Sequence, residues 1–282
     1  MPELPEVETT KLSLQPLIHQ KVKNIVVRNA SLRWTVPDDL ILLCGLTLNQ
    51  LQRRSKYIIA SFGDKKMLWH LGMSGSFRIC DPKEELRKHD HVIFDFGKQQ
   101  LRYHDPRRFG CLLWLDQNTQ KKLLDPLGPE PLSKDFNTEY LQQKLHHKQS
   151  AIKVALMDNH VVVGVGNIYA TESLFNCGIH PAQTASSLSS SQVAQLVNEI
   201  KRILQQAIQL GGSTLRDYSN AMGENGYFQQ TLLAYGRAGE MCVNCETTLQ
   251  NIKLGQRASV FCPQCQPLKN NIPSKIKPRK CK

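Results

Sequence analysis

Four cysteines are the residues whose spacing points most directly to chemistry. They form two Cys-x2-Cys pairs with sixteen residues between the pairs. Four thiolates match the tetrahedral coordination of Zn²⁺, and paired spacing of this kind is typical of zinc sites. A closed four-sulfur site has no open position for a catalytic water, so the sequence predicts one structural zinc ion. The predicted ligands are Cys242, Cys245, Cys262 and Cys265.

The N-terminus carries a second group that could react. Removal of Met1 would expose the secondary amine of Pro2. An α-amino group has a pKa of about 7.7–8.0, so part of it is deprotonated at neutral pH and can attack a carbonyl or an acetal-like carbon. Glu3 and Glu6 follow at a spacing that can share a helix face. Taken alone, the segment is explained more simply as a helix start whose acidic residues suit the helix dipole.

A short glycine-containing motif, GVGN at residues 164–167, predicts a turn. It lacks the third glycine of a dinucleotide-binding motif, because Tyr169 stands in that position, and no clear strand precedes it. We expect a turn between two helices, with Asn167 capping the second helix. The free N–H groups of that helix could receive a phosphate or could carry no ligand.

Two further segments place apolar side chains beside turn residues and cations: residues 70–75 (HLGMSG) and 107–109 (RRF). That combination suits an apolar wedge that enters a base stack, although core residues beside surface arginines would look the same. Lys253 and Arg257, between the cysteine pairs, could meet phosphate or form a solvated hairpin face.

The composition favours a polyanionic partner, most simply a nucleic acid. The 282 residues include 36 Lys and Arg against 24 Asp and Glu, giving a net charge of +12 and a pI near 9.3. No apolar stretch is long enough to cross a bilayer, and the N-terminus does not read as a secretory signal. The five other cysteines are scattered singly, which fits a reducing compartment. We therefore expect a soluble, intracellular protein.

Strand patterns dominate the first half of the chain, and helical periodicity dominates the second half. A β-sandwich or barrel, preceded by a helix at about residues 5–19, is therefore expected. Residues 125–131 hold three prolines and one glycine and are the candidate linker. Further helices are expected at about 151–159 and 168–177. Apolar residues between 193 and 207 recur at three- and four-residue spacing and mark the buried face of another helix, with N-cap candidates at Ser189 to Ser191 and a stop at Gly211. The expected strands cover residues 21–27, 56–62, 66–71, 91–96 and 111–115.

Together these residues resemble the bacterial formamidopyrimidine-DNA glycosylases, a family that repairs 8-oxoguanine. The resemblance runs in order from Met1 to about Gln266. It rests on the cysteine finger and on residues 1–9 (MPELPEVET), 52–57 (QRRSKY), 70–75, 88–91 (KHDH), 105–110 (DPRRFG), 127–132 (LGPEPL), 164–169 (GVGNIY), 178–181 (GIHP), 211–217 (GGSTLRD) and 226–229 (GYFQ).

The resemblance implies an α+β multidomain fold. Its expected parts are an N-terminal catalytic β-sandwich with a terminal helix (1–131), a helix–two-turns–helix domain (132–235), a zinc finger (236–268) and a disordered basic tail (269–282). It also implies a monomer in the bacterial cytoplasm, at the nucleoid, with damaged double-stranded DNA bound in the interdomain cleft. The implied activity removes oxidised purines and cleaves the strand by β,δ-elimination.

The resemblance also implies catalytic roles. Pro2 matches the nucleophile that attacks C1′ and forms a Schiff base. Glu3 matches the acid that protonates the sugar, and Glu6 matches a glutamate of the catalytic pocket. Lys56 matches a phosphate-contacting lysine assigned to β-elimination, and Arg257 matches the finger arginine assigned to δ-elimination.

Other matches imply DNA contacts. His70 and Asn167 match phosphate ligands beside the lesion. The further DNA-binding positions are His89, Arg107 and Lys148. Because the lesion must leave the stack to be reached, the family also needs residues that fill the gap, and these match Met73, Arg107 and Phe109.

Two alternatives remain open at this stage. Endonuclease VIII, a sister enzyme for oxidised pyrimidines, is disfavoured by Leu4 and the gap-filling trio. A non-catalytic zinc-containing DNA-binding protein is disfavoured by Pro2 and Glu3. Residues 219–225, in the family's variable lesion-capping loop, leave the base preference undecided.

Overall fold

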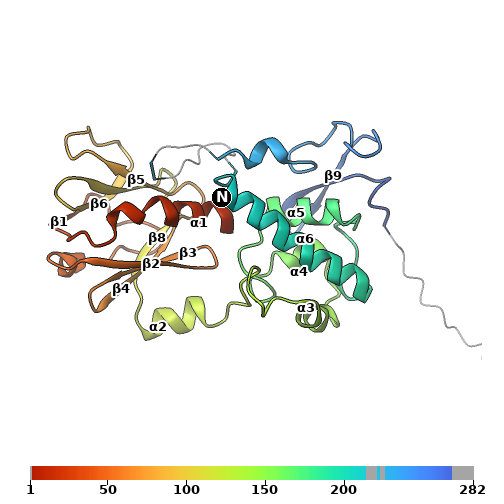
Figure 1. Cartoon of the computed structure of the whole chain (residues 1–282), viewed down its shortest axis with the longest axis horizontal. Helices are drawn as coiled ribbons and strands as arrows, with labels where there is room; N and C mark the ends of the chain where they lie inside the picture. The colour runs from red at the N-terminus through yellow and green to blue at the C-terminus, as the bar shows by residue number, and fades with distance from the viewer. Residues whose placement is uncertain (1, 214–220, 223–225, 269–282) are drawn as a thin grey trace, which may run out of the picture.

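The computed structural model describes residues 2–213, 221–222 and 226–268. The chain forms two halves along the long axis, one with most of the strands and the other with most of the helices, and the N-terminus lies between them (Figure 1). The expected basic tail 269–282, and parts of the 211–217 and 219–225 segments, lie outside the described residues. No helix in the described part of the chain has the length and apolar character that a membrane crossing requires.

The first half is a sandwich of two antiparallel four-stranded sheets. One sheet has the order β1 (Asn24–Val27), β6 (Asp90–Asp95), β7 (Gln100–His104) and β5 (Ser76–Cys80). The other has the order β2 (Leu48–Arg54), β3 (Tyr57–Phe62), β4 (Lys65–His70) and β8 (Cys111–Trp114). Inward-facing aromatic residues fill the space between the sheets, as in other sandwiches. Trp69, for example, packs 4.8 Å from Phe77 and 5.7 Å from Phe94, measured between ring centroids.

Helix α1 (Leu4–Ser13) covers the sandwich and also reaches the helical half. Leu4, Val7 and Leu14 are buried, and α1 contacts β2, β3 and helix α6. The helix is shorter than the expected 5–19. It ends at Ser13 and is followed by a 3₁₀ turn, Gln15–Leu17, because Pro16 cannot donate the backbone bond that a longer helix needs there.

The second half packs α3 (Thr138–Leu145), α4 (Ile152–Leu156) and α5 (Asn167–Asn176) around α6 (Ser190–Gln209). The expected cap and stop of α6 are confirmed. The Ser189 side chain accepts the N–H of Gln192, and Gly211 follows with a φ of +77°. Its apolar face is buried as predicted: Val193, Leu196, Val197, Ile200, Ile203, Leu204 and Ala207.

A hairpin of β9 (Gln250–Leu254) and β10 (Arg257–Phe261) lies between the cysteine pairs, as expected. Gly255 and Gln256, with φ of +51° and +62°, form its two-residue turn, which matches the twist of the strands. The hairpin contacts α5, and the Phe261 ring packs 4.3 Å from the ring of His180.

The five predicted strands correspond to β1, β3, β4, β6 and β8, whereas β2, β5 and β7 were not predicted. After β8 come α2 (Gln117–Thr119) and a π-helical turn, Gln120–Leu124. Residues 127–130, within the candidate linker, form neither helix nor strand. Arg54 donates to the carbonyls of Leu127 and Gly128, and Arg53 and Arg54 both pair with Glu130, so this segment is tied to β2. The domain boundaries proposed from the sequence remain predictions.

Candidate active site

The Glu3 side chain joins the two halves at the N-terminus of α5. One oxygen accepts the N–H of Gly166 at 2.9 Å, and the other accepts the N–H of Ile168 at 3.0 Å. The N–H of Tyr169 adds a longer contact of 3.4 Å. The carboxylate therefore takes the place that an anion occupies at a helix N-terminus.

The environment of Glu3 favours its protonated form. Only 2% of the residue is exposed. Burial raises the pKa of its carboxyl group and the charge of Glu6 adds to this effect, while Lys56 and the α5 N–H groups oppose it. A raised pKa makes the carboxyl group a better proton donor at a given pH than an exposed glutamate would be.

The two glycines of the GVGN motif leave the space that Glu3 and Leu4 occupy. A side chain at Gly166 would place its Cβ 2.3 Å from Cδ of Glu3, and one at Gly164 would place it 2.6 Å from Cβ of Leu4. The predicted turn between two helices is confirmed, but the predicted cap is wrong. Gly166 is the N-cap residue and Asn167 is the first residue of α5, because the Glu3 carboxylate occupies the helix N–H groups from outside. The buried Oδ1 of Asn167 has no hydrogen-bond partner in the described structure.

Glu6 holds the N-terminus from the other side. Its carboxylate accepts the N–H of Glu3 at 2.8 Å and the hydroxyl of Tyr169 at 2.6 Å. It also accepts the N–H and the hydroxyl of Ser213, at 2.9 and 3.0 Å. Pro2, the residue before Glu3 in the chain, is buried. No local pattern in the sequence pointed to Tyr169 or Ser213 as partners of Glu6.

Two cations from distant segments lie near the acidic N-terminus: the charge of Lys56 acts on Glu3, and the charge of Arg257 acts on Lys56. Lys56 lies in the turn between β2 and β3, and Arg257 follows the hairpin turn of the finger. Desolvation of the Lys56 amine lowers its pKa. The charges of Glu3 and Glu6 raise it, and that of Arg257 lowers it further. The predicted set Pro2, Glu3, Glu6, Lys56 and Arg257 therefore comes together from three parts of the chain.

Lys153, on α4, is a neighbour of this site that the sequence analysis missed. It is 1% exposed, and its Nζ donates to the carbonyl of Ala258 and to Oγ of Ser259, both at 2.9 Å. Burial lowers the pKa of Lys153 to about 8, although the charge of Glu3 raises it. The buried amine thus fixes strand β10 one residue beyond Arg257. In the sequence it is a single lysine within a helical, mostly apolar run, which carries no recognisable signal.

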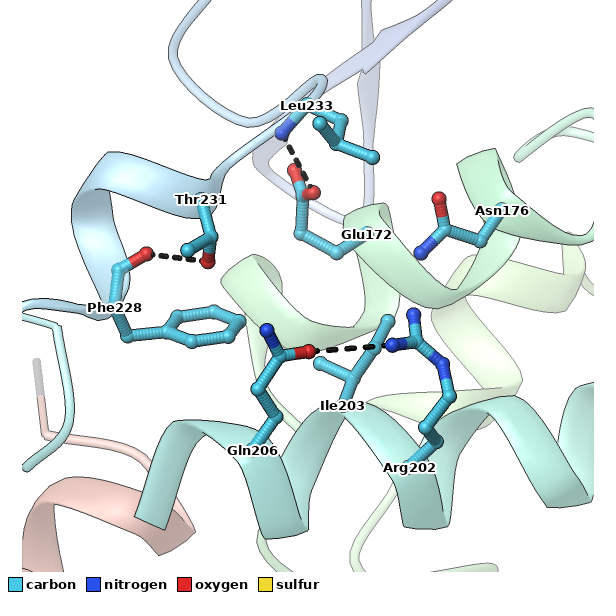
Figure 2. Close-up of a pocket in the computed structure, with 8 residues that line it drawn as sticks. All are labelled: Glu172, Asn176, Arg202, Ile203, Gln206, Phe228, Thr231 and Leu233. Atoms are coloured by element: carbon cyan, nitrogen blue, oxygen red, sulfur yellow. Dashed lines mark hydrogen bonds between the residues drawn. The ribbon is translucent and has the colours of Figure 1, made fainter. Parts of the chain in front are cut away.

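Glu172 fixes the chain that leads into the finger, and the sequence did not reveal it either. Its carboxylate accepts three backbone N–H groups, from Leu233 at 2.8 Å, Ala234 at 3.0 Å and Tyr235 at 2.7 Å. Figure 2 shows Glu172 of α5 bonded to Leu233 on one side of a small pocket, with Arg202, Ile203 and Gln206 of α6 on the opposite side. We assign this pocket a structural role, because its charged side chains are paired within the protein.

His70 presents one nitrogen as a hydrogen-bond donor. Its Nδ1 accepts the N–H of Gly72 at 2.9 Å, so the neutral ring carries its proton on Nε2. Burial lowers the pKa of His70 to about 4, and the charges of Lys56 and Arg33 contribute. His70 is therefore a neutral donor at physiological pH.

The three proposed gap-filling residues lie on two adjacent loops. Met73 is in the β4–β5 loop, and Arg107 and Phe109 are in the β7–β8 loop. Phe109 is 43% exposed, and the guanidinium of Arg107 lies 5.0 Å from the centre of its ring. An apolar ring exposed beside a cation is the arrangement that a base-stack wedge requires.

His89 and Lys148 lie farther from the acidic N-terminus. His89 lines an open hollow with the cations Arg28, Lys88 and Arg108. Lys148 lines another hollow beside the finger hairpin, and its amine pairs with Asp158 at 3.1 Å. Both positions are exposed enough to meet a polyanion.

The four predicted metal ligands converge. Sγ of Cys245 lies 3.4 Å from Sγ of both Cys262 and Cys265, and Sγ of Cys242 lies 3.9 Å from that of Cys265. All four sulfurs fall within 4.8 Å of one another. A tetrahedral Zn²⁺ with Zn–S bonds of about 2.3 Å separates its sulfurs by about 3.8 Å, so the cluster fits such an ion.

Comparison with known proteins identifies the class. Three family profiles match in chain order: the formamidopyrimidine-DNA glycosylase N-terminal domain at residues 1–112, the H2TH domain of the same glycosylases at 127–219, and the zinc finger found in FPG and IleRS at 239–268. A sandwich, an H2TH domain and a four-cysteine finger together define a DNA-binding repair glycosylase. The chain belongs to the formamidopyrimidine-DNA glycosylase family.

Individual relatives agree with this assignment. The formamidopyrimidine-DNA glycosylase of Acinetobacter baumannii (strain SDF) is 74% identical over 269 residues, which cover 95% of this chain and 98% of that protein. Two solved structures of Lactococcus lactis Fpg match with TM-scores of 0.88 and 0.87 at 37% and 38% identity. They cover 94% of this chain and 100% and 99% of theirs. The first is a mutant complexed with Fapy-dG-containing DNA, and the second is a complex with abasic-site DNA.

The neutral His70 predicts an acid-sensitive stability. Its folded pKa of about 4 lies below the ordinary value of 6.5, so the unfolded chain binds more protons between these pH values. Stability should therefore fall as pH falls from 6.5 toward 4, by on the order of 3 kcal/mol in full. His70→Gln should remove this part of the pH dependence in urea unfolding. An identical pH dependence in the two proteins would contradict the assignment.

Proposed function

We propose that this protein removes oxidised purines, 8-oxoguanine and formamidopyrimidines, from double-stranded DNA and then cleaves the strand by β,δ-elimination. The observation that carries the proposal is the buried Glu3 carboxyl group, which has a raised pKa and lies next to Pro2. The bound DNAs of the L. lactis complexes, Fapy-dG and an abasic site, support the choice of substrate and of the second step.

Base release begins with the amine of Pro2. After removal of Met1, the nitrogen attacks C1′ of the damaged nucleotide, and the bond from C1′ to the base breaks. The Pro2 nitrogen loses its proton, and the departing base, which leaves with the bonding electron pair, gains one. Glu3 donates a proton to the sugar oxygen, which opens the ring and leaves an iminium between Pro2 and C1′. The iminium acidifies the proton on C2′, and its loss expels the 3′ phosphate in the β-elimination. A second elimination expels the 5′ phosphate.

Lys56 and Arg257 act on the phosphates. Lys56, whose pKa is lowered, contacts phosphate and assists β-elimination, and Arg257 binds phosphate and assists δ-elimination. His70 donates Nε2–H to a phosphate beside the lesion, and the amide NH₂ group of Asn167 donates to the same backbone. His89, Arg107 and Lys148 extend the contact surface, which the chain's net charge of +12 supports.

The lesion must leave the helix before Pro2 can reach it. Met73, Arg107 and Phe109 enter the gap, and the exposed ring of Phe109 is suited to stack on the remaining bases. We further propose that the cysteine cluster holds one structural Zn²⁺, which keeps the Arg257 hairpin folded, and that the protein acts as a monomer in the cytoplasm.

Replacing the proton donor tests the enzymatic proposal. Wild-type protein should be trapped by borohydride on duplex DNA with 8-oxoguanine opposite cytosine. Glu3→Gln keeps the shape but cannot donate the proton, so base release should fall by roughly 10²–10⁴-fold. Single-turnover assays measure this rate. Glu8→Gln, an acidic-to-amide change on the same helix, is the matched control and should remain close to wild type.

Three outcomes would contradict the proposal. Wild-type excision by Glu3→Gln would show that Glu3 is not the proton donor. No trapping of wild type on any lesion duplex would favour a non-catalytic DNA-binding protein. Trapping on oxidised pyrimidines but not on 8-oxoguanine would favour an activity like that of endonuclease VIII.

Salt dependence tests the proposed binding of the DNA backbone. Removing one cation that neutralises a phosphate reduces the slope of log K against log salt by about 0.9. Lys148→Ala should therefore flatten the slope for any duplex without changing lesion preference, as measured by fluorescence anisotropy. Lys121→Ala removes an exposed charge outside the proposed surface and should leave the slope unchanged. Equal slopes for wild type and Lys148→Ala would exclude Lys148 as a phosphate ligand.

Metal analysis tests the finger. Elemental analysis should find about one zinc per chain, as expected for one closed site. Cys245→Ser should lower both the zinc content and the affinity for DNA, because the hairpin that carries Arg257 depends on the metal. Cys44→Ser, a half-buried cysteine in the sandwich, is the control and should change neither. A zinc-free protein with full DNA affinity would contradict this proposal.

A further inference from the structure

Asp105 is a buried carboxylate for which the proposed chemistry has no use. It lies at the end of β7 and is 0% exposed. Its Oδ1 accepts the hydroxyl of Ser74 at 2.6 Å. Its Oδ2 accepts the N–H of Gly110 at 2.9 Å and the hydroxyl of Tyr103 at 3.2 Å. Three donors from two loops and a strand therefore converge on one acidic side chain.

These bonds connect the two loops that carry the proposed wedge. Ser74 follows Met73 in the β4–β5 loop, and Gly110 follows Phe109 in the β7–β8 loop. Oγ of Ser74 also accepts the N–H of Arg107 at 3.2 Å. Each wedge residue is thus adjacent to, or is itself, a partner in the network around Asp105.

Close backbone packing reinforces the connection. A Cβ at Gly72 would lie 2.3 Å from the carbonyl carbon of Phe109, and one at Gly110 would lie 1.7 Å from the hydroxyl oxygen of Tyr103. Because neither Gly72 nor Gly110 leaves room for a methyl group, the β4–β5 and β7–β8 loops pack directly against each other. Asp105 supplies the polar partners that this packing would otherwise leave unsatisfied.

The backbone of Asp105 also bonds to the segment that contains His89, the proposed DNA-contacting histidine. Its N–H donates to the carbonyl of His89 at 3.1 Å, and its carbonyl accepts Nε2–H of His91 at 2.8 Å. One residue therefore fixes both wedge loops and the segment that presents His89.

We propose that Asp105 is a positioning residue for base extrusion: it locks Met73, Arg107 and Phe109 into one rigid wedge. This inference rests on the proposed function, since it assumes that these three side chains enter the base stack. Opening a base stack costs free energy, and a wedge carried on two independent loops would also lose conformational entropy on insertion. Asp105 does not touch DNA and acts only through the loops.

The role predicts a difference between two substrates. An intact lesion must be forced out of the stack, whereas an abasic site has no base to extrude. Asp105→Ala removes the acceptor of all three donors. It should slow excision of 8-oxoguanine on the order of 10²-fold, the loss typical of a misplaced group, while cleavage of an abasic-site duplex falls far less.

Two further variants keep the test independent of folding. Ser74→Ala removes only the link between the loops and should show the same selectivity with a smaller loss. Asp105→Asn retains an oxygen for Gly110 and Tyr103 and can donate to Oγ of Ser74, so it should restore most of the excision rate. The fluorescence of 2-aminopurine placed beside the lesion, which rises on unstacking, reports extrusion without requiring any chemistry.

Several results would overturn the proposal: equal losses on lesion and abasic duplexes, no loss in Ser74→Ala, or no recovery in Asp105→Asn. An unchanged 2-aminopurine signal in the slow variants would also overturn it. If wild type unstacks the reporter but never excises a base, the proposed enzymatic function fails while the fluorescence comparison still tests the wedge.

Discussion

The contact between the Glu3 carboxylate and the first N–H groups of α5 is the interaction on which the rest of the site depends. It places the N-terminus of one half of the molecule against a helix of the other half. Gly164 and Gly166 are glycines because Leu4 and Glu3 approach too closely for any side chain there. Burial at this contact raises the pKa of the carboxyl group, whereas the bonds from the α5 N–H groups lower it, and burial is the larger effect. The raised pKa suits the proton-donor role that we propose for Glu3.

Each of the two cations near this contact, Lys56 and Arg257, lies at a different tight turn. Lys56 occupies a tight turn of the sandwich, and Arg257 follows a two-residue hairpin turn in the finger. Lys153 and Glu172 attach the finger and its entry segment to the helical half through buried hydrogen bonds. Such bonds are costly to break in a low-dielectric interior, which explains how a small hairpin can present Arg257 at a fixed place.

Much of this arrangement could be predicted from the sequence where the signal is local. Paired cysteine spacing predicted the metal cluster, the apolar period of α6 predicted its buried face, and Ser189 predicted its cap. The strands β2, β5 and β7 were missed because residues such as Arg53, Arg78 and Arg102 interrupt the apolar alternation with charges whose partners are distant in sequence.

The site residues, too, could be predicted only in part from the sequence. The roles of Pro2 and Glu3 came from family resemblance, since their local sequence reads as an ordinary helix start. The cap of α5 was misassigned to Asn167 because the true partner lies more than 160 residues away. Lys153 and Asp105 likewise act through contacts that only the folded chain creates.

Peptide mapping of the borohydride-reduced DNA complex by mass spectrometry is the most direct test of the proposed mechanism. We expect Met1 to be absent and the sugar-derived mass to be attached to the nitrogen of Pro2. Retention of Met1 in the active protein, or a sugar adduct on Lys56 instead of Pro2, would contradict the mechanism.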